Sequence, residues 1–297
     1  MSNNCLKTVI FIDGENLYYN LRSFEFQCEG YDKPFHLEPQ HVDWKKFFDV
    51  LVDKLNEGNQ KRHFLHRIYW YVVESVSPWR EPSPWKLNQA IEKCKELGKV
   101  TSLSEEKSEG EEVRNLARQW YNMMDEAIRR KRQELHSELQ KHTDFLQFRY
   151  IGRLALDPFK VSKFIPASSS SNPSNYHIYK GTIFGEKGVD VGLAVDMVSY
   201  ASNYDAAVLV SGDADFVPAV FEVKRRLRWV YQFSLAKGVP PYIQYLSEDL
   251  KAFVDKFIYV DELTFLKDLL AYDRFSDVVK SRIQERIDEL DMKAPAR

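Results

Sequence analysis

The chain is poor in cysteine and contains no cysteine motif. Its three cysteines, Cys5, Cys28 and Cys94, lie far apart, and no CxxC pair or Cys/His cluster occurs among the 297 residues. This distribution argues against a cysteine-rich zinc site and against a disulfide framework. We therefore expect a protein of a reducing compartment, the cytoplasm.

Long apolar runs and an excess of one charge are missing as well. Residues 9–12 form a short apolar run near the N-terminus, and no segment approaches the ~18 residues of a membrane-spanning helix. We therefore expect neither a signal peptide nor a membrane span. With 42 basic and 44 acidic residues, the net charge is −2. A nucleic-acid partner would therefore have to bind at a local basic patch.

Strand and helix signals alternate along the chain. The hydrophobic content of 44% and the aromatic content of 14% support a sizeable core. Apolar and β-branched runs predict strands at 8–12, 64–73, 145–156, 206–210 and 229–233. Helical spacing predicts helices at 17–23, 41–55, 85–97, 111–140, 217–227, 247–257 and 264–290, and one that begins at Asp190. This alternation predicts an α/β fold with a mostly parallel sheet flanked by helices.

The middle of the chain departs from this alternation. An apolar stripe at helical spacing indicates a long amphipathic helix, and we interpret residues 101–142 as a helical insertion. A serine-rich stretch within 165–176 predicts a mobile loop. The main domain would span residues 1–262, and residues 263–297 would form a C-terminal helical extension.

Three acidic motifs stand where a predicted strand ends or a predicted helix begins. They are residues 9–16 (VIFIDGEN), residues 187–190 (KGVD) and residues 208–216 (VLVSGDADF). Because parallel strands bring their carboxyl ends to one edge of a sheet, Asp13 and Asp213 are expected to lie near each other. Ligands of open α/β sheets bind at that edge.

Each carboxylate alone has an ordinary structural interpretation. Asp13 could cap a helix, Asp190 could interact with a helix dipole, and Asp213 with Asp215 could belong to a turn. Together they would repel one another unless a cation offset their charge. Carboxylate oxygens suit Mg²⁺ or Mn²⁺, so the sequence predicts a divalent metal site.

Two other groups are weaker candidates as metal ligands. Asp196 follows Asp190 by six residues, or about 600° of helix, so the two side chains point roughly 120° apart. We interpret Asp196 as a supporting or anchoring residue. The seven histidines form no HxH or HExxH pair, and we interpret His63 and His66 as structural.

The motifs FIDGENL, KGVDVGLAVDM and VLVSGDADF resemble the signature blocks of the NYN domain, in the LabA-like branch of the PIN-like nuclease superfamily. The resemblance covers about residues 6–30 and 176–262. It implies a parallel PIN-like sheet of about five strands and an acidic pocket for one or two Mg²⁺ or Mn²⁺ ions. The implied metal-binding and catalytic residues are Asp13, Asp190, Asp213 and Asp215. The implied supporting residues are Asn16, Lys187, Asp196 and Ser211.

The resemblance also implies an activity, cleavage of a phosphodiester backbone, and RNA as a more probable substrate than DNA. A bound metal would activate a water for attack on the phosphate, and PIN-like enzymes often add an early glutamate, for which Glu15 is a candidate. Aromatic and basic residues just before Asp190 predict substrate contacts at Tyr179, Lys180 and Lys187. The basic runs at 129–132 and 224–228 more often form solvated faces.

Two alternatives remain open from the sequence. A non-catalytic NYN-type module could bind nucleic acid or regulate a partner, and its long helix could form a homodimer. A haloacid-dehalogenase-like phosphatase would need a DxD motif after the first strand. The chain has Asp13-Gly14-Glu15-Asn16 there, which makes that alternative weaker.

Overall fold

Two compact units make up the chain. The computed structural model describes residues 5–58, 61–97, 109–166 and 177–293. Unit 1 consists of Met1–Val72, Leu135–Ile151 and Val189–Arg297, and unit 2 of Val73–Glu134 and Gly152–Gly188. None of the helices in the described segments combines the length and the apolar character that a membrane crossing requires.

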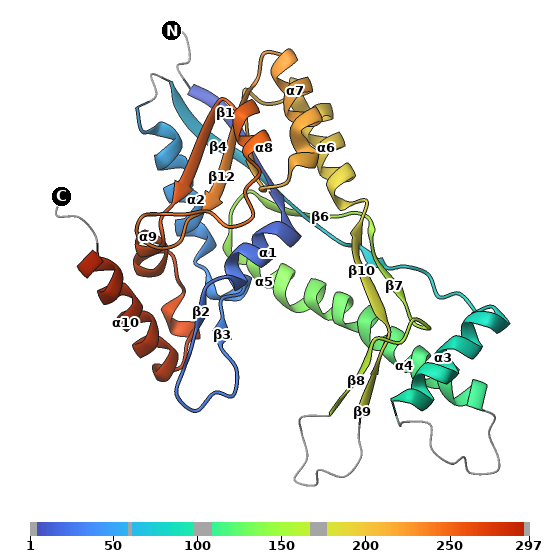
Figure 1. Cartoon of the computed structure of the whole chain (residues 1–297). Coiled ribbons are helices and arrows are strands. Elements are labelled where there is room, and N and C mark those ends of the chain that lie inside the picture. Colours follow the sequence, from blue (N-terminus) through green and yellow to red (C-terminus); the bar gives the residue numbers. More distant parts are fainter. Residues whose placement is uncertain (1–4, 59–60, 98–108, 167–176, 294–297) are drawn as a thin grey trace. The chain divides into compact units, whose positions relative to one another are not determined.

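A parallel sheet forms the centre of unit 1 (Figure 1). Among the described residues it has six strands, in the spatial order β13 (Lys256–Val260), β12 (Trp229–Leu235), β11 (Ala206–Val210), β1 (Cys5–Asp13), β4 (Arg62–Val72) and β6 (Leu146–Tyr150). Every neighbouring pair is parallel. Both faces of β1 and β11 are buried, which explains why these strands read as continuous apolar runs. The predicted α/β class with a mostly parallel sheet is confirmed.

Helices flank the sheet of unit 1. They are α1 (Gly14–Arg22), α2 (Trp44–Asn56), α5 (Ser137–His142), α6 (Val189–Ser199), α7 (Val217–Arg225), α8 (Glu248–Phe253), α9 (Glu262–Asp268) and α10 (Asp277–Lys293). Ile10 and Ile12 of β1 belong to a core that includes Phe47 of α2 and Phe265 of α9. Helix α6 contacts β1 and β4, and α7 contacts β12. A two-stranded ribbon, β2 (Glu25–Phe26) with β3 (Phe35–His36), completes the unit.

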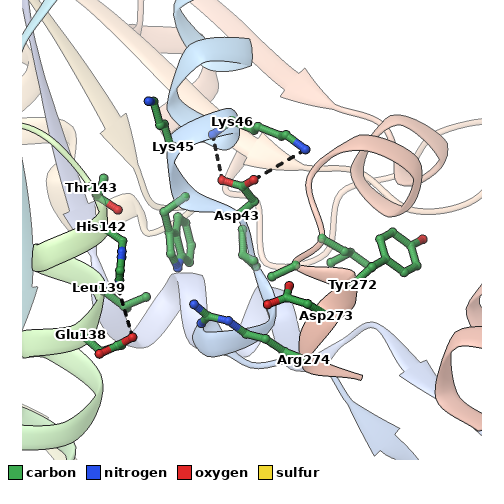
Figure 2. Close-up of a pocket in the computed structure, with 14 residues that line it drawn as sticks. Asp43, Lys45, Lys46, Glu138, Leu139, His142, Thr143, Tyr272, Asp273 and Arg274 are labelled. Carbon is green, nitrogen blue, oxygen red and sulfur yellow. Dashed lines mark hydrogen bonds and ion pairs between the residues drawn. The ribbon is translucent and has the colours of Figure 1, made fainter. Parts of the chain in front are cut away.

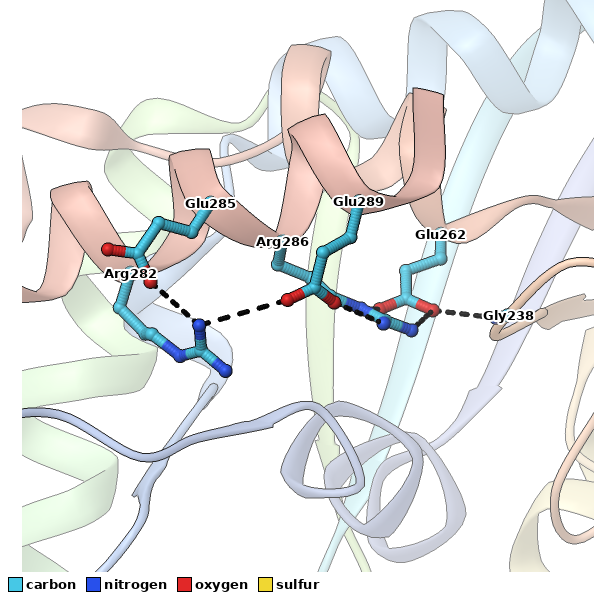
Figure 3. A network of polar contacts seen from close by, with 6 residues as sticks. All are labelled: Gly238, Glu262, Arg282, Glu285, Arg286 and Glu289. Atoms are coloured by element: carbon cyan, nitrogen blue, oxygen red, sulfur yellow. Dashed lines mark hydrogen bonds and ion pairs between the residues drawn. The ribbon is translucent and has the colours of Figure 1, made fainter. Parts of the chain in front are cut away.

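A buried ion pair fastens helix α10 to the start of α9 (Figure 3). Arg286 donates two hydrogen bonds to the carboxylate of Glu262, from Nε to Oε1 at 2.7 Å and from Nη2 to Oε2 at 3.0 Å. The backbone N–H of Gly238 donates to the same carboxylate at 2.6 Å. Three donors therefore compensate a carboxylate that is otherwise removed from water.

Unit 2 has its own sheet and its own core. Its elements are β5 (Ser75–Val76), α3 (Pro84–Glu96), α4 (Glu109–Arg130), β7 (Arg153–Asp157), β8 (Lys163–Pro166), β9 (His177–Lys180) and β10 (Thr182–Lys187). Strand β7 pairs antiparallel with β10 and parallel with β5, and β8 pairs with β9. Val113, Ala117 and Trp120 of α4 are buried in this core. The apolar stripe of the predicted long helix is therefore used inside unit 2.

Several predicted elements have different limits in the structure. The strand predicted at 145–156 is two strands, β6 and β7, which lie in different sheets and are separated at Gly152, where φ is +74°. The helix predicted at 247–257 ends at Phe253, and strand β13 follows.

The predicted long helices are also divided. Helix α4 ends at Arg130, and a π-helical segment, Lys131–His136, separates it from α5. The helix predicted at 264–290 is divided into α9 and α10. Most of the loop predicted to be mobile, residues 167–176, lies outside the described residues.

Candidate active site

The candidate site lies where the carboxyl ends of β1 and β11 meet. Ile12 of β1 pairs with Val210 of β11, so Asp13 and Ser211 are the next residues along two adjacent strands. From β1 the next strand in the sheet is β4 on one side, whereas β11 leads to β12 on the other side. Such a reversal of strand order is where open α/β sheets form a ligand-binding crevice.

Asp13 is held by donors from two segments. The Ser211 hydroxyl donates to Oδ2 of Asp13 at 2.8 Å, and the backbone N–H of Asn16 donates to Oδ1 at 3.0 Å. The second bond makes Asp13 the N-cap of α1, so this residue also has the capping role that its position at the end of a strand suggested. Only 5% of the residue is exposed.

The ionisation of Asp13 is strongly perturbed. Burial raises the pKa of Asp13 to about 6, although the hydrogen bonds from Asn16 and Ser211 act in the opposite direction. The negative charges of Asp190 and Glu15 raise this pKa further. Asp13 and Asp190 therefore interact electrostatically, and a cation near them would stabilise the charged form of Asp13.

An asparagine pair on α1 extends the network to the loop after β11. The Oδ1 atom of Asn16 accepts from the Gly212 N–H at 3.3 Å and from Nδ2 of Asn20 at 2.9 Å. On the neighbouring strand β12, Nε2 of the buried Gln232 donates to the Ser211 carbonyl at 2.9 Å. Neither Asn20 nor Gln232 was predicted from the sequence as a site residue. The i, i+4 spacing of the two asparagines was the available signal for Asn20.

Gly212 fixes the path of the acidic loop. A Cβ atom at this position would lie 1.6 Å from the Tyr245 carbonyl oxygen, so no larger residue fits without a backbone shift. The Gly212 carbonyl accepts from the Ser247 N–H at 2.8 Å. Asp213 then caps a short 3₁₀ helix, Ala214–Phe216, by accepting from the Asp215 N–H at 3.0 Å.

The remaining acidic residues divide between a pocket and an anchor. Asp190 and Asp215 are exposed and line one pocket of about 630 Å³ between α6 and α7. Asp196 instead accepts from the Tyr71 hydroxyl at 2.9 Å and forms an ion pair with Arg149 at 3.0 Å. These contacts tie α6 to β4 and β6, and they direct Asp196 away from a role as a metal ligand.

The four carboxylates are chemically suited to a hard divalent ion, but they do not converge on one point. Asp13, Asp190, Asp213 and Asp215 offer only carboxylate oxygens, which Mg²⁺ and Mn²⁺ prefer. Among the described residues, however, no three His, Cys, Asp or Glu side chains come together as a metal-binding group. The four acids therefore lie on neighbouring elements without forming a closed ligand set.

Comparison with known proteins points to one family model. Residues 129–261 match the NYN domain. The NYN match contains the motifs of Asp190, Asp213 and Asp215 but not the first motif, which carries Asp13. It supports the PIN-like nuclease superfamily and does not address the LabA-like branch.

Other comparisons add little to the NYN match. No curated protein matches the chain. A crystal structure of a protein of unknown function from Vibrio parahaemolyticus is similar to it, with 16% identity and a TM-score of 0.41. The similarity covers 91% of this chain and 99% of that one. It carries no functional argument.

The residues predicted to contact substrate belong to unit 2. Tyr179 is 3% exposed within the core of that unit, and its hydroxyl donates to the Pro158 carbonyl. Its ring is enclosed by the core of unit 2, and the substrate contact of Tyr179 stays a prediction. Lys180 lies in β9, opposite Lys163 of β8, and is partly buried. Lys187 is exposed at the end of β10.

A separate pocket of about 450 Å³ lies beside the start of α2 (Figure 2). Its charged groups include internal pairs, because Lys46 contacts Asp43 at 3.6 Å and His142 contacts Glu138 at 3.2 Å. The Arg274 guanidinium donates to the Gln40 carbonyl at 2.7 Å. This pocket contains none of the residues of the NYN motifs.

Proposed function

We propose that the chain is a metal-dependent nuclease of the NYN type, in the LabA-like branch, that hydrolyses phosphodiester bonds in RNA. The observation that carries the proposal is the environment of Asp13. A buried carboxylate with a raised pKa, at the carboxyl end of a central parallel strand and near the charge of Asp190, is a group that a divalent cation would stabilise. The NYN match supports the same class of activity.

The residues have distinct roles in this proposal. Asp13, Asp190, Asp213 and Asp215 would hold Mg²⁺ or Mn²⁺, which when bound supplies an activated water and neutralises charge on the phosphate. Ser211 and Asn16 hold the Asp13 carboxylate through the hydrogen bonds described above. Asp196 positions α6, and with it Asp190, through Tyr71 and Arg149.

Cleavage of labelled single-stranded RNA tests the proposal. We expect cleavage with Mn²⁺, none with EDTA, and a loss of at least about 100-fold in the Asp13→Asn and Asp213→Asn variants. Asp291→Asn is a matched control, because Asp291 is an exposed acid on α10 that pairs with Lys267. Cleavage that persists in EDTA, or that survives Asp13→Asn, would contradict the metal mechanism.

A non-catalytic binding module is the second candidate. The open arrangement of the acids among the described residues favours it, because a nuclease needs its ligands to converge on an ion. RNA binding without Mn²⁺-dependent cleavage would support this candidate.

The homodimer predicted through the long helix is disfavoured, because the apolar stripe of α4 is buried within unit 2. A monomeric mass in sedimentation equilibrium is the expected result.

A further inference from the structure

Unit 2 contains a basic pocket that the candidate active site does not use. It has a volume of about 480 Å³ and lies beside β7 and β10 and the segment from Ser77 to Lys86. Its charged and aromatic lining consists of Arg80, Glu81, Lys86, Arg153, Asp157, Phe159, Phe184 and Lys187.

Two cations face each other across the ladder of this pocket. Arg153 of β7 and Lys187 of β10 are directly opposed in the antiparallel register, and both are exposed. Like charges at directly opposed positions destabilise a sheet. Within the described part of the chain, neither side chain forms an ion pair with a carboxylate. The pair is therefore suited to an anion that would lie between the two side chains.

The acids of the pocket are already engaged with other cations. Asp157 pairs with Lys86 at 2.7 Å, and Glu81 pairs with Arg118 at 2.9 Å. Arg80, like Arg153 and Lys187, has no carboxylate partner among the residues that the structure describes. Three positive charges thus line one pocket without compensation, which favours a ligand that carries several negative charges.

An aromatic ring accompanies these charges. The register of β10 against β7 shifts between Ile183 and Gly185, so Phe184 is the extra residue of a bulge. Bulges redirect a side chain relative to the regular alternation of a strand, and Phe184 lines the pocket with half of its surface exposed. The Nζ atom of Lys160 lies 5.2 Å from the centre of the ring. An exposed ring beside cations is the pairing that binds unpaired bases.

We propose that this pocket binds the backbone of single-stranded RNA, with Arg80, Arg153 and Lys187 contacting phosphates and Phe184 stacking on a base. The inference rests on the proposed nuclease function, since it names where unit 2 holds the substrate strand. Lys187 precedes Asp190 by only three residues in the sequence.

Fluorescence anisotropy with a labelled single-stranded RNA tests this site, in EDTA so that cleavage cannot occur. The Arg153→Gln/Lys187→Gln variant is expected to bind at least about tenfold more weakly, with the slope of log affinity against log salt smaller by about 1.4. Phe184→Ala is expected to bind about tenfold more weakly, with the slope unchanged.

The matched control removes two exposed arginines elsewhere. Arg225→Gln/Arg226→Gln deletes the same charge from the C-terminal end of α7, where both side chains pair with Glu222, and it is expected to leave the affinity within twofold. Thermal unfolding checks the fold of each variant. The Arg153/Lys187 variant should be at least as stable as the parent, because the substitution removes a repulsion.

Three outcomes would overturn the inference. These are parental affinity in the Arg153/Lys187 variant, an equal loss in the control variant, and competition by inorganic phosphate as strong as that by unlabelled RNA. The third outcome would identify a small-anion site instead. Parent protein that binds RNA through this pocket but does not cleave it with Mn²⁺ would contradict the nuclease proposal and leave this inference standing.

Discussion

The Ser211 hydroxyl donates a hydrogen bond to Oδ2 of Asp13 across 2.8 Å and joins the ends of two adjacent parallel strands. Despite this bond, burial raises the pKa of Asp13 to about 6, from 3.8 for an unperturbed side chain. The native state therefore holds the proton at a pH where the unfolded chain has released it. Between about pH 4 and pH 6, the Asp13 contribution to stability falls as the pH rises.

Replacement of Asp13 by Asn should therefore stabilise the metal-free protein at neutral pH. In EDTA at pH 7.5, we expect the free energy of unfolding to rise by about 1–3 kcal/mol, because a buried charge is removed. At pH 3.5 most of the gain should disappear, since the parent carboxyl is then protonated in the native state and mostly protonated in the unfolded state. Urea unfolding at the two pH values measures the difference. A less stable variant at pH 7.5 would contradict the assigned cause of the pKa shift.

Substitutions of Asp190 and Asp196 should have different effects, although both residues lie on α6. The first should weaken metal binding, and the second should lower stability. Asp190→Asn is expected to weaken Mn²⁺ binding at least about tenfold with little change in stability, because its side chain is exposed. Asp196→Asn should cost about 1–3 kcal/mol of stability through its bonds to Tyr71 and Arg149. Electron paramagnetic resonance of free Mn²⁺ and urea unfolding give the two readouts. Equal effects of the two variants in both assays would refute the division.

Gly212 should be intolerant of any side chain. Gly212→Ala is expected to destabilise the protein by more than about 2 kcal/mol or to displace the acidic loop, because the new Cβ would meet the Tyr245 carbonyl. Gly58→Ala is the control, since Gly58 has positive φ but no atom within 4 Å of its Cβ position, and it should cost about 1 kcal/mol. Thermal unfolding compares them. A harmless Gly212→Ala would mean that the loop relaxes easily.

The Glu262–Arg286 pair should be worth far more than an exposed pair on the same helix. Arg286→Met leaves the buried Glu262 carboxylate without its guanidinium partner and is expected to cost about 3 kcal/mol. Lys267→Met, which removes the exposed partner of Asp291, should cost less than about 1 kcal/mol. Adding Glu262→Gln to Arg286→Met should recover part of the loss in chemical denaturation. Equal losses from the two single substitutions would contradict the role of burial.

The sequence was most informative where local pattern and tertiary environment agree. Strands β1 and β11 are buried on both faces, so their β-branched runs were unambiguous. The first two residues of β13, Lys256 and Phe257, were predicted as the end of a helix, because Leu250 and Phe257 continue an apolar spacing across the end of α8. Only pairing with β12 distinguishes the two states there.

The candidate site, too, could be predicted from the sequence only in part. The acids could be identified because each follows a strand or begins a helix. Their division into pocket-lining and anchoring residues could not be predicted. That division depends on the packing that places Asp190 and Asp215 beside one pocket and Asp196 against Arg149. The burial of Tyr179 could not be predicted for a related reason. An aromatic residue next to a lysine resembles a base-stacking segment, and only the packing of unit 2 reveals that the ring is internal.

The hydrogen bond between Asp13 and Ser211 spans 198 residues of chain. During synthesis Asp13 therefore leaves the ribosome 198 residues before its partner does. A nascent or prematurely terminated chain that stops before Ser211 carries the first acidic motif without the strand that completes its surroundings. Competence of the site is thereby linked to synthesis of the chain through β11 and Ser211.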